Sequence, residues 1–131
     1  MELTLNKYQE QAMTTCMPSS ENFSYMFLNL VGEVGELASK VAKHIRKEKA
    51  TIVDNEFVLE CENIEELVRE DDPLYDELKK EAGDILWQLS GVCTIFGWSL
   101  EEVAQMNLDK LAARKKAGTI VGNGDGIERE A

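Results

Sequence analysis

The sequence predicts an all-α fold of the four-helix-bundle type, and three observations support this prediction. Only two prolines occur in 131 residues, apolar residues recur at spacings of three and four over most of the chain, and capping residues mark the ends of these stretches. We expect one helical domain over 1–118, with an insertion at 48–72 between the second and third helices. A glycine-rich tail follows at 119–131.

The first two helices are predicted from their caps and apolar stripes. The first covers about 5–15, with Thr4 or Asn6 as its cap, and Pro18 breaks the pattern that follows. The second covers about 24–47 and carries a broad apolar stripe that would face a core. Basic residues crowd its last turn, where they suit the helix dipole.

Residues 48–72 break this helical periodicity. Two β-branched or aromatic runs within 51–59 flank Asp54-Asn55, a pair that suits the tight turn of a short hairpin. Residues 63–70 have the length and pattern of one or two helical turns. We treat the whole segment as an insertion into the helical domain.

The third and fourth helices have clear start and stop signals. Asp72-Pro73 supplies a cap followed by proline at the first helical position, and Gly97 ends the third helix. Ser99-Leu-Glu-Glu102 is a capping box that opens the fourth helix, which Gly118 closes. The glycine-rich tail is either a lid that folds over a bound ligand or a chain end without a role.

The charge balance excludes several classes of partner. The chain has 14 Lys and Arg against 25 Asp and Glu, giving a net charge of −11. This charge disfavours binding to nucleic-acid backbones and to anionic membranes. The negative charge does not exclude phosphate-bearing small molecules as ligands, because a bound metal ion can link their phosphates to carboxylates. Three cysteines without a CxxC spacing, and an N-terminus without a secretory signal, predict a cytoplasmic protein.

Two acidic pairs are the strongest candidates for chemistry. Glu33 and Glu36 stand three residues apart on the second helix, as do Glu81 and Asp84 on the third, so each pair shares a helical face. Together they would offer oxygen ligands to a hard cation such as Mg²⁺. Acidic residues are so frequent in this chain that such pairs also arise by chance on solvated faces.

Burial favours the metal interpretation. Glu81 falls within the apolar seam of the third helix, and a buried carboxylate usually pairs or binds a metal. On the second helix, Asn29 and Lys40 extend the polar row of the two glutamates. Gly32 and Gly35 flank these acids and indicate a close approach to the backbone, either by a ligand or by a neighbouring helix.

The fourth helix supplies positive charge. Asn107, Lys110 and Arg114 lie on one row of this helix, towards its basic end. These groups either neutralise phosphates or only complement the helix dipole. His44 is the only histidine, which excludes histidine-based triads and multi-histidine metal sites.

The chain resembles the MazG-like nucleoside triphosphate pyrophosphohydrolases, members of the all-α NTP pyrophosphatase superfamily, at several motifs in the same order. These motifs are LVGEVGEL at 30–37, EAGDILW at 81–87, SLEEV at 99–103, NLDKLAAR at 107–114 and the ending GTIVGNGD at 118–125. The resemblance covers 4–47 and 77–125. Each motif alone is weakly specific, whereas the ordered set is fairly specific.

This resemblance implies hydrolysis of a nucleoside or deoxynucleoside triphosphate between its α- and β-phosphates, dependent on Mg²⁺ with Mn²⁺ as a substitute. It implies a bundle completed by oligomerisation, as a homodimer or homotetramer, and a role in nucleotide-pool house-cleaning. The implied metal ligands are Glu33, Glu36, Glu81 and Asp84. The catalytic base would be Glu33 or Glu36. The expected substrate-binding residues are Asn29, Asn107, Lys110 and Arg114.

Two alternative functions stay open at the level of the sequence. One is a phosphoribosyl-ATP pyrophosphohydrolase-like enzyme of the same fold, which would differ in substrate. The other is a non-enzymatic helical interaction module, in which the acids form only a solvated face. A di-iron carboxylate bundle is set aside, because it requires Glu-x-x-His pairs and His44 belongs to none.

Overall fold

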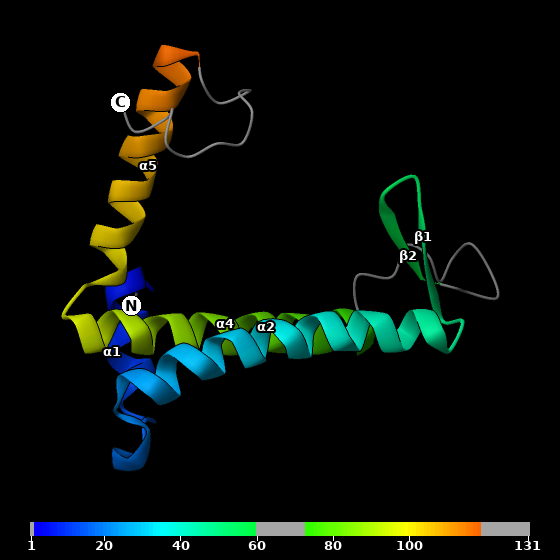
Figure 1. Cartoon of the computed structure of the whole chain (residues 1–131), viewed down its shortest axis with the longest axis horizontal. Helices are drawn as coiled ribbons and strands as arrows, with labels where there is room; N and C mark the ends of the chain where they lie inside the picture. Colours follow the sequence, from blue (N-terminus) through cyan, green and yellow to red (C-terminus); the bar gives the residue numbers. More distant parts are fainter. Residues whose placement is uncertain (1, 60–72, 119–131) are drawn as a thin grey trace.

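The computed structural model describes residues 2–59 and 73–118, and this part of the chain is mostly helical (Figure 1). The prediction of an all-α fold is confirmed. The described helices are α1 (Leu5–Met13), α2 (Phe23–Arg46), α4 (Pro73–Phe96) and α5 (Leu100–Ala117), with a short 3₁₀ turn at Pro18–Ser20. The predicted helical turns at 63–70 and the glycine-rich tail lie outside the described residues.

The helix ends follow from local chemistry. The Thr4 side chain accepts a hydrogen bond from the Lys7 backbone N–H at 3.1 Å, so Thr4 rather than Asn6 caps α1. The predicted capping box at Ser99 and Glu102 is present at the start of α5, with both reciprocal hydrogen bonds formed. Gly118 ends α5 with a φ of 71°, a left-handed conformation that glycine adopts without strain.

A two-stranded hairpin stands at one end of the molecule (Figure 1). Strands β1 (Ala50–Val53) and β2 (Glu56–Leu59) pair antiparallel, and Asp54 and Asn55 form the turn with φ values of 51° and 66°. Positive φ at both positions is the requirement of the tightest hairpin turn. The buried residues Ala50, Leu59 and Leu74 form a small core that attaches this hairpin to the start of α4.

The long helices α2 and α4 lie side by side and antiparallel, and they form the main body of the chain (Figure 1). Among the described glycines of this pair, Gly91 is the most tightly packed, because an added Cβ would lie 2.7 Å from the Cε atom of buried Met26. Within the chain, the close approach of a neighbouring helix is therefore at Gly91, and the approach of a ligand to Gly32 and Gly35 stays a prediction. Gly35 has nothing within 4 Å of an added Cβ.

Helix α1 crosses the end of this pair and supports the corner between α4 and α5. The Trp87 indole N–H donates to the Ala12 carbonyl oxygen at 3.0 Å, which attaches α1 to α4. Gln9 accepts from the Leu100 backbone N–H at 2.8 Å and donates to the Trp98 carbonyl oxygen at 2.9 Å. These contacts satisfy backbone groups that helix ends leave open, and α5 then extends away from the α2–α4 pair (Figure 1).

Much of the apolar stripe predicted for the second helix is exposed in the single chain. Phe27, Val31 and Val34 are 47%, 63% and 49% exposed, although the sequence pattern predicted a core face. The reason is geometric, because α4 covers only one side of α2 and no other described helix makes extensive contact with α2. Among the described helices, none is long and apolar enough to cross a membrane.

Candidate active site

Three carboxylates gather midway along the α2–α4 pair. Glu33 comes from α2, whereas Glu81 and Asp84 come from successive turns of α4. One oxygen atom from each of the three carboxylates lies within 4.8 Å of the others. Glu33 and Glu81 are half-buried, and Asp84 is exposed. The i, i+3 spacing on α4 and the antiparallel packing of α2 thus produce a compact acidic cluster.

The mutual repulsion of these acids is visible at Glu33. Its pKa is raised above the usual value of 4.5, first by burial and then by the charges of Asp84, Glu81 and Glu36, while an interaction with Asn29 opposes the shift. Glu36 is exposed and outside the cluster of three, but near enough to act on Glu33. Carboxylates at this proximity favour a cation among them.

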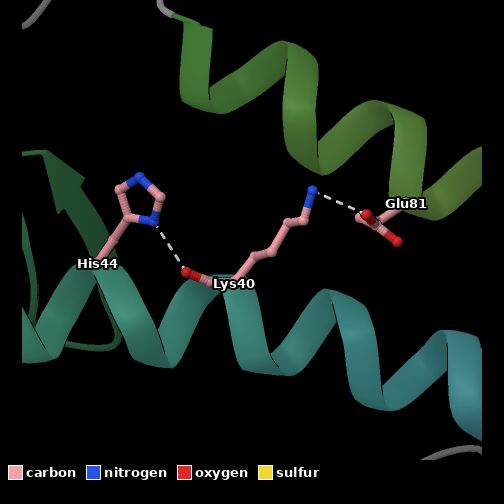
Figure 2. Close-up of polar contacts among 3 residues, drawn as sticks. All are labelled: Lys40, His44 and Glu81. Carbon is pink, nitrogen blue, oxygen red and sulfur yellow. Dashed lines mark hydrogen bonds and ion pairs between the residues drawn. The ribbon is translucent and has the colours of Figure 1, made fainter.

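Lys40 supplies a cation from the protein itself. Its Nζ atom lies 2.8 Å from Oε1 of Glu81, and the two side chains are 35% and 13% exposed. Figure 2 shows this ammonium reaching from α2 across to α4, beside His44. The hydrogen bond to Glu81 is the main reason that the pKa of Lys40 is raised above 10.5. The sequence placed Lys40 on the polar row but gave no signal of this ion pair.

A cleft continues from the acidic cluster towards the hairpin end of the α2–α4 pair. Its volume is about 690 Å³, and both Glu81 and Asp84 line it. The remaining lining is largely basic and consists of Lys40, Lys43, His44, Lys47, Lys49 and Lys80, with Glu77. The cleft therefore combines five lysines with three carboxylates, and Lys40 is paired with one of them, Glu81.

The predicted residues of the fourth helix do not join this site within one chain. Asn107 and Lys110 are exposed and Arg114 is half-buried, all on α5, which points away from the α2–α4 pair (Figure 1). Asn29, by contrast, lies one turn before Glu33 and interacts with its carboxylate. Of the predicted substrate-binding residues, the chain itself therefore brings only Asn29 next to the acids.

Residues 21–119 match the family model of the MazG nucleotide pyrophosphohydrolase domain. The chain belongs to this family. It is also 36% identical over 107 residues to the Gene 37 protein of Mycobacterium phage L5, an alignment that covers 82% of this chain and 78% of the phage protein. No solved structure gave a significant match. Membership in the MazG family supports a nucleotide pyrophosphohydrolase activity.

The acidic cluster of this MazG chain fits a divalent metal ion. Carboxylate oxygens are the preferred ligands of hard cations such as Mg²⁺, which also keeps several of its waters. Glu33, Glu81 and Asp84 already converge without rearrangement of the backbone. Tyr8 of α1 is a further neighbour of this cluster, which the sequence did not indicate. Its pKa is raised by burial and by the charge of Asp84.

Proposed function

We propose that this protein hydrolyses nucleoside or deoxynucleoside triphosphates between the α- and β-phosphates, in a reaction that depends on Mg²⁺ or, as a substitute, Mn²⁺. The observation that supports this most strongly is the convergence of three carboxylates within 4.8 Å beside a cleft rich in lysine. The products would be the nucleoside monophosphate and pyrophosphate. Nucleotide-pool house-cleaning is the role we propose for such an activity.

The residues divide the chemistry between them. Glu33, Glu36, Glu81 and Asp84 would hold the metal, which supplies charge neutralisation to the phosphates when bound. A water molecule attacks phosphorus, the anhydride P–O bond breaks, and a carboxylate accepts the proton that the water loses. Glu33 and Glu36 are the candidates for this base. Asn29 would help to orient Glu33, whose carboxylate it contacts.

A pyrophosphate-release screen tests the substrate assignment. Canonical, deoxy and modified nucleoside triphosphates are compared with phosphoribosyl-ATP in the presence of Mg²⁺, and we expect turnover of the triphosphates only. Alanine at Glu81 or Asp84 should lower kcat by about 100-fold or more, the scale of lost electrostatic stabilisation, with helix content unchanged. Asp76→Ala, on the same helix but outside the cluster, is the control.

The same carboxylates distinguish an enzyme from an interaction module. Glu33→Gln and Glu36→Gln are each measured for kcat and for metal affinity by calorimetry. The variant that loses kcat while it keeps metal affinity identifies the base. Full activity in any two alanine variants of Glu33, Glu36, Glu81 and Asp84 would contradict the assignment.

We also propose that the active form is a homodimer or homotetramer. Apolar side chains of α2 are exposed in the single chain, with Phe27, Val31 and Val34 47%, 63% and 49% exposed. Four aromatic side chains in mutual ring contact are each about half exposed on the surface, namely Phe23, Phe27, Phe96 and Trp98. A second copy would cover such apolar surface, and Lys110 and Arg114 would reach the site only from a neighbouring subunit. Light scattering at micromolar concentration should show no stable monomer.

A further inference from the structure

The basic lining of the cleft is unusual for a chain of net charge −11. Five lysines and His44 gather there, out of 14 Lys and Arg in the whole sequence. Lys40 and Lys43 lie on one face of α2, Lys47 follows at its C-cap, and Lys80 approaches from α4. The local charge of this groove is therefore opposite in sign to that of the protein.

Helix-dipole effects account for only part of this cluster. Basic residues in the last turn of α2 are favoured by the negative end of that helix. Lys80, however, lies about two turns into α4, beyond the first turn over which the dipole acts, and Lys49 lies beyond the end of α2. The cluster also brings Lys43 and Lys47 together at i, i+4, a spacing at which like charges destabilise a helix.

The three carboxylates of the cleft offset only part of the charge of its five lysines. Among the described residues, Lys40 is the one cleft lysine in an ion pair, with Glu81. His44 donates from Nδ1 to the Lys40 carbonyl oxygen at 2.9 Å, which orients the ring and leaves Nε2 for another partner (Figure 2). Such an arrangement has a repulsive energy that a bound polyanion would relieve.

We infer that this cleft binds the pyrophosphate moiety of the substrate, with Lys43, Lys47 and Lys80 as its phosphate-binding residues. This inference rests on the proposed function, because Glu81 and Asp84 belong both to the acidic cluster and to the wall of the cleft. A triphosphate whose scissile bond lies at the carboxylates would extend its β- and γ-phosphates towards the lysines. The cleft, rather than α5, then supplies positive charge to the leaving group within the same chain.

The test compares two double variants that change the charge equally. Lys43→Gln with Lys80→Gln removes one lysine of the cleft from each helix. Arg46→Gln with Lys79→Gln removes neighbouring cations from the same two helices, and neither of these residues lines the cleft. Binding of inorganic pyrophosphate in the presence of Mg²⁺ is measured by calorimetry, and circular dichroism verifies that each variant is folded.

We expect the cleft variant to bind pyrophosphate about tenfold more weakly, because it loses two charge-assisted contacts. The control variant should stay within about twofold of the unmodified chain, since exposed charges outside the site contribute little. Equal affinities in the two variants, or no pyrophosphate binding by the unmodified chain, would overturn the inference. If the double variant fails to fold, pyrophosphate affinity is measured for Lys47→Gln alone, for which we expect a smaller loss of affinity.

A second measurement distinguishes failure of this inference from failure of the proposed function. Triphosphate turnover is measured separately on the unmodified chain. A clear contrast in pyrophosphate binding without any turnover would leave the cleft assignment in place and refute the proposed reaction. Normal triphosphate turnover without a difference in pyrophosphate binding between the two double variants would support the proposed reaction and refute the cleft assignment.

Discussion

Replacing Lys40 by methionine should produce two opposite effects. In the metal-free protein, the ammonium of Lys40 lies 2.8 Å from Glu81 and offsets part of the repulsion among the clustered acids. A metal ion that binds Glu81 must displace this ammonium or tolerate it nearby. Lys40→Met, which keeps the length and apolar stem of the side chain, should therefore weaken the metal-free fold and strengthen metal binding.

The magnitude follows from the exposure of the pair. Exposed ion pairs contribute about 0.2–1 kcal/mol, whereas hydrogen bonds to charged groups reach about 1.5–3 kcal/mol. The Lys40 side chain is 35% exposed and that of Glu81 13% exposed, which places this pair near the boundary of the two classes. We therefore take about 1 kcal/mol, equivalent to about a fivefold change in Kd. In a domain of this size the same energy lowers Tm by about 4 °C.

Titration calorimetry with Mg²⁺ or Mn²⁺ and thermal unfolding in EDTA measure the two effects. Lys79→Met removes the same charge from α4 outside the cleft and serves as the control. A metal affinity of Lys40→Met equal to or below that of the control would contradict this prediction. An unchanged unfolding temperature of the metal-free variant would contradict it as well.

Two further substitutions test the acidic cluster and the helix packing. Glu33→Gln should stabilise the metal-free protein at about pH 7.5. Folding raises the pKa of Glu33, and the ionised carboxylate therefore opposes folding at this pH. This gain should vanish as the pH falls through the folded pKa towards the usual 4.5, which thermal unfolding in EDTA would show. Gly91→Ala should lower the free energy of unfolding by up to about 2 kcal/mol, because overpacking against Met26 costs about 1–3 kcal/mol while the gain in helix propensity is about 1 kcal/mol. Gly83→Ala, with nothing within 4 Å of its added Cβ, should raise that free energy in denaturant titrations.

The helices could be predicted from the sequence because their signals are local. Caps such as Thr4 and Ser99 satisfy the N–H groups of their own helix, and Gly118 adopts a left-handed conformation that glycine reaches without steric cost. The hairpin turn at Asp54–Asn55 is equally local. The close packing at Gly91 was not predicted, since it depends on Met26, which lies 65 positions earlier in the sequence.

The convergence of Glu33, Glu81 and Asp84 depends on a similarly local pattern. The i, i+3 spacing of Glu81 and Asp84 fixes their common face on one helix, and only the partner helix had to be assumed. Lys40 and Tyr8 carried no such signal. Their positions depend on the relative shift of α2 and α4 and on the path of α1, which no local pattern specifies.

The basic residues show where sequence reasoning reaches its limit. A row of cations on the fourth helix and a row on the second are equivalent as patterns, since each lies near a helix C-terminus and each suits the dipole. The tertiary arrangement separates them, because α2 packs against the helix that carries Glu81 and Asp84, whereas α5 turns away (Figure 1). A highly acidic protein can then bind a polyanion in a cleft whose local charge is positive. The carboxylates require a divalent cation for this, and we therefore expect no turnover without one.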